Sequence, residues 1–253
     1  MRLSLGANQN KDRMDTGVLF APLIALAAYF VRGVAGFGSA LVASPLLAQF
    51  FPLTLVVPLV VILDNGGSIL QAWQHRASIA WRDLSPLLPF SLIGIALALQ
   101  LHAWLQSEAL KLALGLFVMA FALYQLLPLP QAHISRRWAA PAGFLGGLVG
   151  GLFGTGGPFY VMYYRLRGLS KTVFLASLAM LFVIDGGLRI LGFAWGGHYT
   201  EQHAWMLASM APAAWLGLRL GHRLHLGLTQ TQFTRILNAL LLISGSLLVW
   251  RSL

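Results

Sequence analysis

In the stretch Gly33-Val34-Ala35-Gly36-Phe37-Gly38-Ser39, three glycines interrupt a long apolar segment, and an altered copy, Gly150-Gly151-Leu152-Phe153-Gly154-Thr155-Gly156-Gly157-Pro158, interrupts another. Such runs predict breaks in two helices. Within a bilayer, broken backbone is tolerated only where protein or a water-filled cavity covers it, because lipid offers no hydrogen-bond partners. Paired breaks at corresponding places in two halves of a chain are typical of transporter binding sites.

The composition indicates a membrane protein with several spans. Hydrophobic residues make up 58% of the chain and charged residues 9%, whereas a soluble domain carries about a quarter charged residues. The net charge of +10 would suit nucleic acid, but the arginines cluster in short loops between apolar segments. That placement follows the positive-inside rule, so we expect a lipid bilayer and no nucleic acid as partner. There is no cysteine and no His-Glu-x-x-His pattern, so we expect no metal, no cofactor and no catalytic group.

Eight apolar segments divide the chain into two halves. The first segment, residues 18–51, is too long for one straight helix and short for two full spans, so a helix–break–helix hairpin is predicted at its glycines. We expect a polar N-terminal tail over residues 1–17, a first membrane repeat over 18–127, a linker over 128–138 and a second membrane repeat over 139–253. Translation can start at Met1 or at Met14.

The repeat extends beyond the glycines. Matches between the halves keep one order along the chain, with an offset that drifts slowly from 118 to 123 residues. The matched pairs are Gly36 with Gly154, Gly38 with Gly156, Asp64 with Asp185, Trp73 with Trp195, Pro89 with Pro212 and Gly94 with Gly217.

Charge placement favours hairpins that return to their own side of the membrane. Eight simple crossings would divide the loop and tail cations eight against seven, whereas hairpins in the first and fifth segments divide them ten against five. The positive-inside rule then places both termini outside the cytoplasm. The predicted fold is all-α: a polytopic transmembrane helical bundle of two inverted repeats. Each repeat has a broken, re-entrant Gly-rich hairpin and three spanning helices, and the hairpin tips meet near the midplane.

The glycine breaks predict an anion cradle. Helix N-termini present unpaired N–H groups and positive dipole ends, and glycines let a ligand approach them. Ser39 and Thr155 add hydroxyl donors at nearly equivalent positions. The alternative is that the small residues serve close helix packing. The predicted substrate-binding residues are Gly36, Gly38, Ser39, Gly154, Thr155, Gly156, Gly157 and Arg189.

Four ionisable residues lie inside the predicted spans, where a charge needs a partner or a cavity. Asp185 and Arg189 have the i, i+4 spacing of a helical ion pair. This pair either ties helices together or leaves Arg189 to face an anion and Asp185 to relay a proton. Asp64 has no basic residue at helical spacing in its own segment, so it either pairs with Arg32 or is protonated by burial. Asp64 and Asp185 are the predicted proton-coupling residues.

These motifs resemble the TauE/SafE sulfite exporter family, from about residue 18 to residue 253. The resemblance rests on Gly33-x-x-Gly-Phe-Gly-Ser with Pro45-Leu46-Leu47, on the glycine run from Gly146 to Pro158, and on Lys171-x-x-Phe174-x-Ala176-Ser177-Leu178 leading to Asp185-x-x-x-Arg189. It implies a secondary transporter that exports sulfite, sulfonates or related small organic anions with the proton gradient.

The leading hypothesis is therefore an anion exporter of the cell inner (plasma) membrane that works by alternating access. Its expected partners are a small anionic substrate and protons, and a homodimer is left open. One alternative is a membrane-embedded enzyme, which would need a nucleophile–base pair or a metal cluster within the spans, and none is visible in the sequence. The other is a non-transporting membrane assembly protein, which would be expected to carry a soluble partner-binding region.

Overall fold

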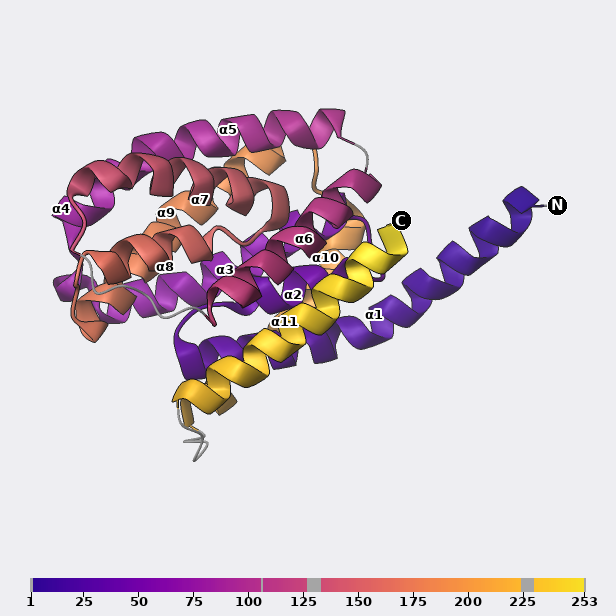
Figure 1. Ribbon diagram of the computed structural model, residues 1–253. Helices are drawn as coiled ribbons and strands as arrows, with labels where there is room; N and C mark the ends of the chain where they lie inside the picture. The colour runs from indigo at the N-terminus through magenta and orange to yellow at the C-terminus, as the bar shows by residue number, and fades with distance from the viewer. Residues whose placement is uncertain (1, 106, 127–132, 224–229, 253) are drawn as a thin grey trace.

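The computed structural model describes residues 2–105, 107–126, 133–223 and 230–252, which are helical almost throughout and contain no β-strand (Figure 1). The predicted all-α class is confirmed for these residues, and residues 128–132 of the predicted linker lie outside them. The helices are α1 (Arg2–Ala35), α2 (Ser39–Leu47), α3 (Leu53–Gln74), α4 (Trp81–Leu84), α5 (Leu88–Trp104), α6 (Ser107–Tyr124), α7 (Ala139–Phe153), α8 (Gly157–Leu166), α9 (Lys171–Trp195), α10 (Glu201–Arg223) and α11 (Gln230–Ser252). Short 3-10 turns occupy Arg76–Ser78, Ser85–Leu87 and Arg136–Trp138.

In the described part of the chain, six helical segments are long and apolar enough to cross a membrane, so this is a multi-pass membrane protein. They are Thr16–Ala35, Leu53–Gln74, Trp81–His102, Ser107–Tyr124, Lys171–Trp195 and Arg235–Ser252. The helix α10 has 23 residues but is not among the six. The helix α1 is unbroken from Arg2, so the segment predicted as a polar tail continues directly into the first span.

The chain forms two helical hairpins, α1–α2 and α7–α8, and each returns to the end of the bundle where it began. The first turns at Gly36 and Gly38, whose φ values of 84° and 98° are left-handed. It closes beside its start, because a Cβ on Gly17 would lie 2.6 Å from the Cβ of Phe50. The second hairpin consists of α7 and α8. At its base, Ile134 N–H donates a hydrogen bond of 3.0 Å to the carbonyl of Leu166.

The helices that follow the two hairpins, α3 and α9, pack against each other and run antiparallel. Asn65 Nδ2 donates to the carbonyl of Val183 at 3.0 Å, and fifteen residues further on Ala80 N–H donates to Ser177 Oγ at 2.8 Å. Each hairpin lies at the end where its following helix begins. The hairpins α1–α2 and α7–α8 therefore enter the bundle from opposite ends, as the courses of α1 and α7 in Figure 1 show.

Residues matched between the halves make matching contacts. Gly94 lets α5 approach α7 closely, because an added Cβ would lie 2.2 Å from the carbonyl oxygen of Phe144. Gly217 does the same for α10 and α1, with 2.2 Å to the carbonyl oxygen of Leu26. Helix α5 of the first half thus packs against the α7–α8 hairpin of the second half. Helix α10 of the second half packs against the α1–α2 hairpin of the first half. These contacts join the two halves.

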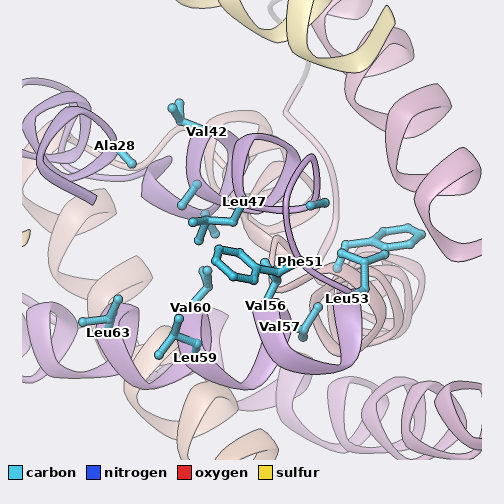
Figure 2. Close-up of a cluster of buried hydrophobic side chains, with 14 of the residues drawn as sticks. Ala28, Val42, Leu47, Phe51, Leu53, Val56, Val57, Leu59, Val60 and Leu63 are labelled. Carbon is cyan, nitrogen blue, oxygen red and sulfur yellow. The ribbon is translucent and has the colours of Figure 1, made fainter. Parts of the chain in front are cut away.

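The short helix α2 is enclosed by protein. Eight of its nine residues are buried, and it lies among α1, α3, α6 and α11. Figure 2 shows Leu47, at its end, and Phe51 lying close to Val56 and Val60 of α3. Because lipid does not reach this segment, its irregular backbone is tolerated at membrane depth.

At one end of the bundle, the Asp83 carboxylate of α4 forms ion pairs with one arginine just before α7 and one just after α8. Arg167 Nε donates to it at 2.8 Å and Arg136 Nε at 3.2 Å. Arg167 also donates to the carbonyl of Ile134 at 2.6 Å. The α4 turn of the first half therefore anchors the base of the second hairpin, a contact that no sequence pattern indicated.

Candidate anion-binding site

A small cavity of about 30 Å³ lies where the two helix breaks meet. Its wall includes most of the residues predicted for binding and coupling: Gly38, Ser39, Asp64, Gly154, Thr155, Gly156, Gly157 and Arg189. Two predicted residues lie elsewhere. Gly36 lines a larger neighbouring cavity, and Asp185 is fully buried. The structure thus brings segments more than 100 residues apart to one point in the bundle.

Two helices begin at this cavity. The N-cap of α2 is Gly38 and that of α8 is Gly156, and neither helix has a side-chain hydrogen bond that caps its first turn. The first N–H groups of a helix have no partner within that helix. Their dipoles favour an anion at the helix start. The positive dipole ends of both helices therefore point at the cavity.

Beside the first break, the Asp64 carboxylate accepts two hydrogen bonds and forms an ion pair. The hydroxyl groups of Tyr29 and Ser39 donate to Oδ1 at 2.5 and 2.6 Å. The Arg32 guanidinium lies 3.4 Å from the same oxygen and also donates to Ser68 Oγ at 2.7 Å. Asp64 therefore pairs with Arg32, one of the two alternatives left by the sequence. Its side chain is 22% exposed, so this carboxylate is partly accessible from the cavity.

Beside the second break, Asp185 has a corresponding set of partners. It forms the predicted i, i+4 ion pair with Arg189. It also accepts hydrogen bonds from the hydroxyls of Ser91 and Tyr160, the latter at 2.8 Å. Arg189 in turn donates to the carbonyl of Gly150 at 3.2 Å. Asp185 itself is 0% exposed, whereas the side chain of Asp64 is 22% exposed.

Sequence reasoning missed the hydroxyl partners of both aspartates. Tyr29, Ser91 and Tyr160 are polar residues within largely apolar helices. Their only signal is that each could hydrogen-bond across a helix interface, as such residues often do in membranes. Which acid each would reach depends on the packing of helices far apart in the chain.

Three donors on residues that line the cavity have no hydrogen-bond partner among the described residues. They are Thr155 Oγ1 and the Nε atoms of Arg32 and Arg189, all on residues at most 4% exposed. A buried donor left without an acceptor costs about 1–3 kcal/mol, and more when it is charged. Guanidinium and hydroxyl donors suit an oxyanion, which offers several acceptor oxygens.

A larger cavity of about 710 Å³ adjoins the small one and shares Phe37, Gly38 and Leu41 with it. Gly36 and the cationic side chains of Arg165 and Lys171 also line it. The two cations lie at the end of the bundle where α8 ends and α9 begins. The helix breaks can therefore be reached from that end.

Comparison with known proteins gives a consistent result. The family model described as "Sulfite exporter TauE/SafE" matches residues 21–248. The "Probable inner membrane transporter protein TsaS" of Comamonas testosteroni is 27% identical over 203 residues, which cover 76% of this chain and 83% of that protein. The "Probable sulfite/organosulfonate exporter TauE" of Cupriavidus necator is 26% identical over 221 residues, which cover 81% and 85%. No solved structure matches the chain significantly.

Proposed function

Because the chain belongs to the sulfite exporter TauE/SafE family, whose members are transporters and not enzymes, we propose that it exports a small anion across the cell inner membrane. The anion is sulfite, a sulfonate or a related organic anion. Export is coupled to protons and proceeds by alternating access between two inverted halves. One relative bears the name of a sulfite/organosulfonate exporter, and this supports the choice of substrate class.

One observation carries the proposal: Thr155 and Arg189, whose Oγ1 and Nε have no hydrogen-bond partner among the described residues, line a cavity at which two helices begin. Hydroxyl, guanidinium and N-terminal N–H groups all donate hydrogen bonds, and a dianion or monoanion with several oxygens could accept from all of them. The packing alternative explains the glycines but leaves these donors without a role.

Two features support alternating access. The hairpins enter from opposite ends and meet at the cavity, so a rocking motion of one half against the other could expose it to either side. The large cavity reaches the helix breaks from the end that carries Arg165 and Lys171. By the positive-inside rule that end is cytoplasmic, and an exporter loads its substrate there.

We also infer that both termini lie outside the cytoplasm. The cations Arg136 and Arg167 share one end of the bundle through Asp83, as the hairpin topology requires. A reporter fused after Leu127 should be cytoplasmic and one fused after Leu253 external. Paired reporters active on opposite sides of the membrane, such as a fluorescent protein and a secreted phosphatase, make this measurement. Finding both fusions on the same side would contradict inverted halves.

Anion flux into proteoliposomes, with and without a pH gradient, tests the function itself. We expect wild-type protein to accumulate sulfite or a sulfonate when a gradient is imposed. Asp64→Asn is the matched variant, because it mimics a protonated, partly accessible carboxylate. It should keep downhill anion exchange and lose proton-driven accumulation. If its dependence on the gradient equals that of wild type, Asp64 does not carry the proton. If wild-type protein moves none of these anions, the proposed substrate class is wrong.

A further inference from the structure

We propose that Arg32 binds the transported anion together with Arg189, and that the two arginines are functional equivalents supplied from non-equivalent positions of the repeat. The proposal rests on the anion transport proposed above. It assigns to the first half a binding residue that the repeat does not reveal, because the matched position in the second half is not an arginine.

The repeat offsets show that the arginine lies on a different element in each half. Gly36 and Gly154 are 118 residues apart, and the same offset carries Arg32 of α1 onto Gly150 of α7. Asp64 and Asp185 are 121 residues apart, and that offset carries Ser68 of α3 onto Arg189 of α9. One half therefore has arginine on the hairpin and serine after the aspartate. The other half has glycine on the hairpin and arginine after the aspartate.

Each guanidinium donates a hydrogen bond to the residue that the repeat matches with the other arginine. Arg32 donates to Ser68 Oγ at 2.7 Å, and Arg189 donates to the Gly150 carbonyl at 3.2 Å. A Cβ on Gly150 would lie 2.5 Å from the Cζ of Arg189. Each half thus has room for one guanidinium between its hairpin and the helix that follows. The arginine can come from the hairpin, as Arg32 does, or from the following helix, as Arg189 does.

The two arginines also share the features expected of a ligand-binding group. Both line the small cavity, and their exposed fractions are 2% and 4%. Each has an aspartate that neutralises its charge and a buried Nε without a partner among the described atoms. With Thr155 between the breaks, the donors suit an anion whose head carries at least three oxygens, as sulfite and sulfonates do.

Moving the arginine within the first half tests this equivalence. The full-length protein is purified in detergent, and its thermal unfolding is followed while sodium sulfite is added, with sodium chloride at equal ionic strength as reference. Arg32→Gly should weaken the apparent sulfite affinity by about tenfold or more, the loss expected for a charge-assisted hydrogen bond. Adding Ser68→Arg rebuilds the arrangement of the second half and should restore most of that affinity. The reciprocal pair, Arg189→Ser with Gly150→Arg, is the matched control.

A folded exchange variant that does not regain affinity over Arg32→Gly would overturn the proposal. If the exchange variant does not fold, Arg32→Gln with Asp64→Asn decides, because it removes both charges and strands neither. Sulfite affinity equal to wild type in that neutral variant would also overturn the proposal, and loss of sulfite binding would support it. A wild-type protein that sulfite and methanesulfonate do not stabilise would instead refute the substrate class on which the inference rests.

Discussion

Asp185→Asn is expected to lose most of its folded protein. The substitution leaves the Arg189 guanidinium charged and almost fully buried, with no carboxylate beside it. It also weakens the acceptor for the hydroxyls of Ser91 and Tyr160. Removing one partner of a buried ion pair costs about 3–5 kcal/mol, which is a large part of the stability of an ordinary domain. Fluorescence-detected size exclusion and thermal unfolding in detergent measure the loss.

Adding Arg189→Gln to Asp185→Asn should restore part of the folded protein, because no buried charge then remains unpaired. Asp64→Asn is the comparison variant, since it also leaves a buried guanidinium, that of Arg32, without its carboxylate, but at an acid that is 22% exposed. The restored double variant also separates the two roles left open for the pair. If it transports anion normally, the pair is structural. If it folds and does not transport, the pair acts in transport, with Arg189 facing the anion or Asp185 relaying a proton. A single Asp185→Asn variant as stable as wild type would contradict the buried pair.

The sequence was sufficient to predict the helix breaks for a physical reason. Two full spans and a loop do not fit into residues 18–51, and a bilayer forces the backbone of that segment to be either helical or covered by protein. Glycines at Gly36, Gly38 and Gly154 then mark where the helices stop. A lipid environment excludes most of the backbone conformations that a chain in water can adopt. Segment length and glycine placement therefore predict much of the fold.

The site was less predictable, because its partners come from helices that the sequence does not place side by side. The i, i+4 spacing marked Asp185 and Arg189, but no spacing links Arg32 to Asp64 or Asp83 to Arg167. The exchange between Arg32 and Arg189 hides the symmetry further, since matched positions hold different residues. What the two halves share is the place of a guanidinium in space, and that becomes visible only when α1, α3, α7 and α9 are packed.

Gly38→Leu is expected to leave the protein in the membrane and to abolish transport. Gly38 has φ of 98°, no atom lies within 4 Å of an added Cβ, and the residue lines the cavity. A left-handed conformation costs a residue with a side chain roughly 1–2 kcal/mol, which a folded bundle can tolerate. The leucine side chain would then fill the cavity and cover the first N–H groups of α2. Proteoliposome flux and membrane-extracted protein yield are measured together.

Two other glycines make this a controlled test. Gly197 lies in the turn after α9 with φ of 68°, and no atom lies within 4 Å of its added Cβ. Gly197→Leu therefore carries similar backbone strain away from the cavity and should keep transport. Gly156→Leu is expected to lose folded protein instead, because a Cβ there would lie 2.2 Å from the carbonyl oxygen of Gly146. If Gly38→Leu transports anion as well as Gly197→Leu does, the helix break serves packing and the anion passes elsewhere.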